Sequence, residues 1–336
     1  MPKNKVMKKI QHIIGVDLSK KTIDLFSYET KVAIQINNNT FGFKQLIRWC
    51  KQQHINLSQT MIVMEHTGLY SFCFEGFLHQ QQIRFAKVNA LAIKRSLGII
   101  RGKSDKIDAQ RIARYGFEKQ WVLIAEKPAA KELQRLQILN TTREHLTRQK
   151  AALLSAAKEY GNIGLAKQDL VMQTHQRLIK QFEKEIQKLE TEMNDLINNN
   201  PEFQSNYKLL TSIKGVGTVL AIATLLKTKN FTRFSNARKF ACFCGTAPFE
   251  YTSGTSIKGK TKVSHLADKR MKSLLDLAAK SAIQYDKELR AYYLKRVEEG
   301  KSKMSTINIV RNKLIYRMFA VVKRQTPFIE NYLRAA

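Results

Sequence analysis

Strand-forming runs are confined to about the first 90 residues of the chain, and helical patterns fill most of the rest. Residues 12–28 are predicted to form a hairpin, because two β-rich runs flank a short polar turn at Ser19–Lys21. Strands in hairpin order, followed by strands that alternate with helices, predict a mixed α/β sheet. The further strands are expected at 32–37, 61–65 and 83–89, and helices at 40–51 and 104–119.

The middle of the chain, from about 129 to 200, is predicted to be helical with a break at Gly161 and Gly164. Apolar residues in its second half are spaced alternately by three and four, as in an a/d heptad seam. One helix packed in a bundle and a coiled-coil arm for dimerisation or spacing both remain open. The seam consists of Met172, His175, Ile179, Phe182, Ile186, Leu189, Met193 and Leu196. Residues 201–336 are predicted to be mostly helical, with a Gly/Thr/Ser-rich loop at 245–261.

The charge of the chain is strongly positive. Its 336 residues include 58 Lys plus Arg and 27 Asp plus Glu, which gives a formal net charge of +31. With 43% apolar residues the chain is not a disordered basic tail, so the charge lies on folded domains. Such a field suits a polyanion, most commonly nucleic acid. An acidic membrane surface is the alternative, but no amphipathic anchor or lipidation motif supports it.

Several other classes are excluded by the sequence. No run approaches 18 uninterrupted apolar residues, and the basic N-terminus lacks the apolar run of a secretory signal. The four cysteines make no disulfide framework, and Cys242 with Cys244 has no second Cys/His pair at zinc spacing. We therefore expect Cys242 and Cys244 to be buried thiols, and the protein to be cytoplasmic with no membrane partner.

Four acidic residues stand where a metal site can form. Asp17 ends the run I-I-G-V-D and Glu65 ends M-I-V-M-E, and ligand sites of open α/β sheets gather at the carboxyl ends of strands. In S-D-K-I-D, Asp105 and Asp108 share one face of a helix that Ser104 can cap. Four converging carboxylates repel each other unless a divalent cation neutralises them, and oxygen ligands suit Mg²⁺ or Mn²⁺. Two such ions can clamp the attacking and leaving oxygens of a phosphodiester.

Each acid taken alone has a simpler explanation. An Asp after a strand is usually a turn former, and Asp105 with Asp108 can line a solvated first helical turn. The ordered set is more specific than its members, and the basic residues around it suit a phosphate backbone. These residues are Lys94, Arg95, Arg101, Lys103, Arg111 and Arg114.

Three motifs in order resemble the RuvC-like, RNase H-fold domain of DEDD insertion-sequence transposases. They are G-V-D-L-S-K, E-x-T-G at 65–68 and K-x-D-x-x-D-A at 103–109. This family, numbered one hundred and ten, also includes the Piv-type DNA invertases, and the resemblance covers nearly the whole chain. It implies a RuvC-like catalytic domain at 1–125, a helical coiled-coil region at 126–200 and a transposase domain at 201–336. It also implies that the metal-binding acidic tetrad consists of Asp17, Glu65, Asp105 and Asp108.

The run I-K-G-V-G-T-V-L-A at 213–221 looks like a helix–hairpin–helix turn. Gly215 and Gly217 permit positive φ, so that backbone N–H groups can point together at a phosphate. A plain connection between helices is the alternative. DNA binding by such a turn would be independent of base sequence.

A serine between Thr and Gly in a basic loop is, by composition alone, usually a turn residue. The resemblance implies more, because the family carries G-L-T-P, a short spacer and then S-G with a serine nucleophile. Gly245, Pro248, Ser253 and Gly254 match that pattern, so Ser253 takes the nucleophile position. Thr246 and Ala247 depart from the family's Leu and Thr, and Ser256 and Tyr251 are close enough to be confused with the nucleophile.

A serine hydroxyl is a poor nucleophile until a base or a metal ion takes charge of its proton. The loop offers no local His–Asp pair, and His265 is more often structural or phosphate-facing than a base, so the metal-bound carboxylates are the obvious source of activation. Basic residues nearby can stabilise the charged transition state. These are Lys258, Lys260, Lys262, Lys269 and Arg270.

We therefore expect a DNA transposase or recombinase in which Ser253 forms a transient phosphoserine link. A metal-dependent RuvC-like nuclease that uses water, and a non-catalytic nucleic-acid-binding protein, remain alternatives. A sugar-kinase-like function for G-V-D-L-S conflicts with the charge of +31. The resemblance further implies double-stranded donor and target DNA and a structured guide (bridge) RNA that pairs with both. It also implies a homo-oligomer, dimer or tetramer, and a composite site formed by the acidic and serine domains.

Overall fold

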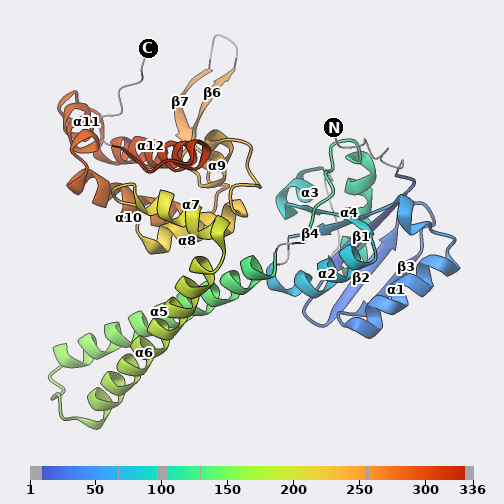
Figure 1. The fold of residues 1–336 in the computed structure, drawn as a ribbon, viewed down its shortest axis with the longest axis horizontal. Coiled ribbons are helices and arrows are strands. Elements are labelled where there is room, and N and C mark those ends of the chain that lie inside the picture. Colours follow the sequence, from blue (N-terminus) through green and yellow to red (C-terminus); the bar gives the residue numbers. More distant parts are fainter. Residues whose placement is uncertain are drawn as a thin grey trace. The chain divides into compact units, whose positions relative to one another are not determined.

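The structure is a computed structural model that describes residues 10–66, 68–96, 98, 105–128, 130–253 and 257–329, with the backbone alone at 105, 106, 253, 257, 258 and 260. The chain divides into two compact units, Met1–Ala130 and Lys131–Ala336. The first unit runs from blue to green in Figure 1, and the second from green to red. In the described part of the chain, no helix is both long and apolar enough to cross a membrane.

The first unit is built on a five-stranded mixed sheet, as the sequence predicts. Its order is β3-β2-β1-β4-β5, in which β1 is antiparallel to β2 and parallel to β4. The strands are β1 (His12–Leu18), β2 (Thr22–Ser27), β3 (Ala33–Asn37), β4 (Thr60–Glu65) and β5 (Arg84–Val88). The helices are α1 (Thr40–Gln52), α2 (Phe72–Gln80), α3 (Ala90–Ser96) and α4 (Asp105–Glu118), with 3₁₀ turns η1 (Leu57–Gln59) and η2 (Gly68–Ser71).

The sheet separates two apolar layers, because successive side chains of a strand point to opposite faces. Helices α1 and α2 cover one face and α3 and α4 cover the other (Figure 1). The first layer joins Phe43, Leu46, Phe74 and Leu78 to Ile14, Val16, Ile62 and Met64. The second joins Ile93 and Ile112 to Ile13, Met61, Val63 and Val88.

Helix α4 lies directly against the backbone of β1 at Gly15. A Cβ atom at Gly15 would stand 2.2 Å from both the carbonyl oxygen of Ala109 and the amide nitrogen of Ala113. Only glycine allows this approach, since any side chain would push the helix away. Gly15 therefore sets how closely α4 approaches the strand that carries Asp17.

The second unit begins with a long helical hairpin, in which α5 (Lys131–Asn162) and α6 (Leu170–Asn198) lie side by side (Figure 1). The break between them falls at the predicted glycines, and all eight seam residues of α6 are buried or half-buried. Three ion pairs cross the hairpin in antiparallel order: Arg135–Glu192, Arg143–Glu190 and Lys150–Glu183. The heptad seam of α6 thus has a partner within the same chain.

The rest of the second unit is a helical core with one β-hairpin. Its helices are α7 (Pro201–Thr211), α8 (Thr218–Thr228), α9 (Ala237–Phe243), α10 (Lys269–Tyr285), α11 (Lys287–Glu298) and α12 (Lys303–Arg324). The prediction of an irregular loop at 245–261 is wrong, because β6 (Pro248–Ser253) and β7 (Ile257–Val263) pair there as an antiparallel hairpin. Described residues of this ribbon are mostly exposed, so it lacks the apolar alternation that marks a half-buried strand.

Candidate active site

Asp17 and Glu65 stand level with each other on neighbouring strands. The parallel register pairs Gly15 with Val63 and Val16 with Met64, so the next positions along the strands are Asp17 and Glu65. Alternation puts both residues on the face that carries Gly15 and Val63, which is the face that α4 covers. The structure therefore confirms that both residues lie at the carboxyl ends of strands, and it shows that these two strands are neighbours.

Helix α4 brings its first turn to the same edge of the sheet. A Cβ at Gly116 would lie 2.7 Å from Val63 and 2.8 Å from Ile13, whereas Ala109 and Ala113 lie against Gly15. The helix thus runs opposite to β1, from the level of Ile13 at its end toward that of Asp17 at its start. This direction carries positions 105 and 108 toward the two strand-end acids.

Asp108 is engaged in an ion pair within its own helix. Arg111 Nη1 donates to Asp108 Oδ1 at 2.8 Å, and both side chains are partly buried. Asp105 opens α4 and is described by its backbone only, and Lys103 and Arg101 lie outside the described residues. Among the residues with described side chains, no three of His, Cys, Asp and Glu are grouped closely enough to hold a metal ion.

One further acid faces this edge and was missed by the sequence reasoning. Asp24 in β2 pairs directly with Asp17 across the β1–β2 hairpin, so the two carboxylates share the α4 face of the sheet. Gln35 Nε2 in β3 donates to both oxygens of Asp24 at 3.1 Å. The hairpin register contained the signal, because pairing Leu18 with Ile23 around the turn sets Asp17 opposite Asp24.

A buried polar chain on the other face holds the loop that follows Glu65. Glu75 in α2 is fully buried, and its Oε1 accepts hydrogen bonds from Lys87 Nζ at 2.8 Å and from the Ser71 hydroxyl at 2.5 Å. The Ser71 oxygen also lies 3.1 Å from the carbonyl oxygen of Gly68. The chain of contacts therefore links β5 to the E-x-T-G segment.

The predicted nucleophile occupies the last position of β6. The register pairs Ser253 with Ile257, Thr252 with Lys258, Tyr251 with Gly259 and Phe249 with Lys262, with a β-bulge between the last two pairs. Lys262 is exposed, and so are Lys269 and Arg270 in the first turn of α10. Arg270 Nε lies 3.4 Å from Glu144 Oε1 on α5. Lys258 and Lys260 are placed on β7 by their backbone.

The base of this hairpin is fixed to α12. Thr246 is fully buried, and its carbonyl oxygen accepts hydrogen bonds from Asn308 Nδ2 and Asn312 Nδ2, both at 2.9 Å. Its hydroxyl lies 2.9 Å from Asn312 Oδ1. Gly245, just before it, has φ +66° and no room for a Cβ beside Ala267. Thr246, one of the two residues that depart from the family pattern, thus anchors the base of the β6–β7 hairpin.

The glycine-rich turn before α8 has a packing role in this structure. Gly215 has φ +90°, and a Cβ there would lie 2.6 Å from the carbonyl oxygen of Ala278 and 2.8 Å from the Cβ of Ala282 on α10. Gly217 is extended and caps the start of α8. Both the backbone conformation and the contact with α10 therefore require glycine at 215, whether or not the turn binds phosphate.

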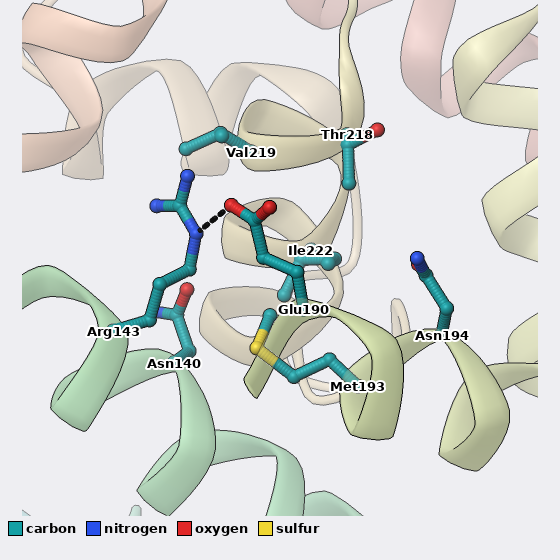
Figure 2. Close-up of a pocket in the computed structure, with 8 residues that line it drawn as sticks. All are labelled: Asn140, Arg143, Glu190, Met193, Asn194, Thr218, Val219 and Ile222. Atoms are coloured by element: carbon teal, nitrogen blue, oxygen red, sulfur yellow. Dashed lines mark hydrogen bonds and ion pairs between the residues drawn. The ribbon is translucent and has the colours of Figure 1, made fainter. Parts of the chain in front are cut away.

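A small pocket lies where the α5–α6 hairpin meets the start of α8. Figure 2 shows Arg143 and Glu190 bridging the two long helices, with Arg143 Nε 2.6 Å from Glu190 Oε1. Thr218, Val219 and Ile222 of α8 complete the wall. Because the guanidinium already has a carboxylate partner, the pocket offers an anion no uncompensated charge, and we assign it a structural role.

Two protein-family models match separate parts of the chain. Residues 14–159 match the model of the DEDD transposase domain of the IS110 family, and residues 207–294 match the model described as "Transposase IS116/IS110/IS902 family". The pilin gene-inverting proteins of Moraxella bovis and Moraxella lacunata are each 28% identical over 328 residues, which is 94% of this chain and 97% of theirs. An uncharacterized 43.6 kDa protein of insertion element IS110 from Streptomyces coelicolor is 29% identical over 147 residues, 44% of this chain and 35% of its own. The chain therefore belongs to the IS110 family of DEDD transposases and is a DNA-recombining enzyme.

Proposed function

We propose that this transposase cuts and rejoins DNA through a transient phosphoserine link at Ser253, supported by a divalent-ion site at Asp17, Glu65, Asp105 and Asp108. The observation that carries the proposal is the level placement of Asp17 and Glu65 on the face that α4 covers, with the first turn of α4 directed to the same edge. The strand order β3-β2-β1-β4-β5 supports a RuvC-like assignment of this unit.

The donor set fits a hard divalent cation. All four residues offer carboxylate oxygens, which suit Mg²⁺ and, as an alternative, Mn²⁺. Asp24 beside Asp17 adds negative charge to the edge, and directly opposed like charges are destabilising without a compensating cation. When bound, such an ion lowers the pKa of a coordinated hydroxyl and stabilises charge on the phosphate oxygens.

The serine's part can be written as a balanced exchange. The Ser253 oxygen forms an ester bond to phosphorus and gives up its proton. The bond from phosphorus to one DNA oxygen breaks, and that oxygen takes up a proton and leaves as a DNA hydroxyl. Attack by a DNA hydroxyl on the same phosphorus reverses the exchange and frees the serine, so strands are rejoined without an external energy source. Basic residues around the hairpin supply positive charge that stabilises the phosphate during the transfer. These are Lys258, Lys260, Lys262, Lys269 and Arg270.

The partners proposed for this enzyme follow from its charge and its family. The net charge of +31 supports binding to double-stranded donor and target DNA, with Lys103, Arg111, Gly215 and Gly217 as further backbone contacts. We also propose a structured guide RNA, a dimer or tetramer as the active form, and a cytoplasmic location. Residues 1–125, 126–200 and 201–336 then serve as catalytic, coiled-coil and transposase regions.

Covalent trapping tests the proposal. Incubation with target DNA and Mg²⁺, followed by a denaturing gel, should show a protein–DNA adduct in the parent enzyme and none in Ser253→Ala or Asp17→Ala. Lys280→Ala, on the exposed side of α10, should keep the adduct. If Ser253→Ala still cuts DNA at the parent rate and no adduct forms with any variant, water is the nucleophile and the serine assignment is wrong.

A further inference from the structure

Tyr251 stands two positions before Ser253 in β6, and its side chain is 71% exposed. Among the described residues its ring has no aromatic or cationic partner, whereas Phe249 lies 5.9 Å below the guanidinium of Arg238. The exposed ring offers an apolar face with a polar hydroxyl at its tip to whatever binds the hairpin. Its position next to the proposed nucleophile calls for a functional explanation.

One side of the ring lies against the residue opposite it. Gly259 pairs with Tyr251 across the hairpin, and a Cβ atom at Gly259 would lie only 2.8 Å from Cδ1 of the Tyr251 ring. The ring therefore lies over the glycine, in the space that any other residue would fill. This placement leaves the outer side of the ring open to a ligand.

The surroundings of the ring favour a polyanion. Between residues 227 and 272 the chain carries eleven Lys and Arg against Glu250 and Asp268. Lys262, on the strand opposite, is exposed, and Arg238 is exposed beside Phe249. An exposed aromatic ring among cations is the arrangement that proteins use to stack a nucleobase while the backbone phosphates are neutralised.

We propose that Tyr251 is a stacking platform for an unpaired DNA base next to the phosphodiester that Ser253 attacks. A base within an intact duplex is already stacked on both sides, so the ring can receive only a base that has left its stack. The inference rests on the proposed function for the position of the base, but the stacking itself needs no chemistry. The tyrosine hydroxyl takes no part.

The test uses two DNA duplexes that differ at one base. In one, 2-aminopurine stands opposite an abasic site, and in the other it is paired with thymine. The full-length protein should bind the unpaired duplex on the order of 10-fold more tightly, the scale on which alanine substitution of a stacking aromatic acts. Binding should also quench the 2-aminopurine fluorescence of the unpaired duplex. Equal affinity for the two duplexes would overturn the proposal.

Variants separate the ring from the hydroxyl and from the fold of the hairpin. Tyr251→Phe should keep the preference, and Tyr251→Ala should remove it. Tyr251→Leu, which still covers Gly259 but has no π face, should behave like the alanine variant. Tyr285→Ala is the matched control, since that tyrosine is 64% exposed at the end of α10. A preference that survives in Tyr251→Leu, or that is lost in Tyr251→Phe, contradicts stacking.

The result is distinct from that of the covalent-trapping test. Ser253→Ala should keep the preference for the unpaired duplex, because a stacked base does not need the nucleophile. A parent enzyme that shows the preference but never forms an adduct would refute the serine mechanism and leave the platform standing. An adduct that forms in Tyr251→Ala at the parent rate, together with an unchanged preference, would refute the platform alone.

Discussion

At the scale of single residues, the buried carboxylate of Glu75 depends on one charged partner, Lys87, for its stability. Glu75 is fully buried, and within the described residues its Oε2 has no hydrogen-bond partner, so Lys87 and Ser71 on Oε1 provide all its compensation. The Lys87 side chain is itself only 9% exposed. Removing one member of a buried pair leaves the other charge desolvated and uncompensated.

Lys87→Met should therefore destabilise the protein strongly, by about 3–5 kcal/mol in the free energy of unfolding. Urea unfolding, followed by a spectroscopic signal from the first unit, measures this loss. The double variant Lys87→Met with Glu75→Leu should recover most of it, because no charge then remains buried. If the double variant is as unstable as the single one, the charge pair is not the cause and the loss comes from packing.

The acidic residues at the carboxyl-end edge of the sheet, Asp17, Glu65 and Asp24, show which site residues could be predicted from the sequence. Asp17 and Glu65 were predictable because each ends an apolar strand, and the strand ends of an α/β sheet gather ligands. Asp24 was not predicted, because its part depends on the register of the β1–β2 hairpin rather than on a motif. The sequence showed Gly15 only as part of a motif, whereas in the structure its lack of a side chain is what lets α4 approach β1.

At the scale of helices and strands, end signals explain why the boundaries were predictable. Asn39 and Asn200 accept hydrogen bonds from the first turns of α1 and α7, and Pro201 opens α7 where its missing N–H costs nothing. The β6–β7 hairpin was predicted as a loop, because its described residues are mostly exposed and its composition is that of turns. Its anchor on Asn308 and Asn312 lies about 60 residues further along, beyond the reach of local patterns.

The cap of α10 makes stability depend on pH. Burial alone would raise the pKa of Asp268, but hydrogen bonds from Lys227 and from the Met271 amide outweigh it, so the pKa lies below its usual value. A carboxyl whose folded pKa is lowered stabilises the protein above its unfolded pKa of about 3.9 and loses that contribution as the pH falls through the folded pKa.

Asp268→Asn keeps the cap, since Asn and Asp cap helices about equally, but removes the charge that Lys227 binds. The variant should be less stable than the parent at neutral pH. The difference should begin to shrink as the pH falls below about 4 and vanish once the pH is below the lowered folded pKa of Asp268. Thermal unfolding measured across that range tests this. Asp169→Asn, at the cap of α6, is the control and should show a smaller difference, because no lysine pairs with Asp169 among the described residues.

For the whole molecule, the excess of positive charge is the property that follows most directly from the amino-acid composition. Part of it is already compensated: Lys280 pairs with Asp276 at 2.8 Å, and the pKa of Asp276, although burial opposes this, is lowered by hydrogen bonds from Lys280 and Arg311. Lys262 on the β6–β7 hairpin is exposed, and no carboxylate of the described chain pairs with it. The two lysines therefore differ in the charge that they can offer to a phosphate.

Binding to duplex DNA should release about 0.9 counterion per phosphate contact, so the logarithm of the affinity should fall linearly with the logarithm of the salt concentration. On the order of ten contacts would give a slope near −9, and a slope flatter than about −3 would mean that the charge serves another purpose. Lys262→Gln should make the slope shallower by about 0.9, because one phosphate contact is lost. Lys280→Gln should change the slope by less, since Lys280 is held in an ion pair with Asp276, a carboxylate that Arg311 also contacts. Equal effects of the two variants would show that net charge alone governs binding, and that the hairpin lysine makes no specific contact with the DNA backbone.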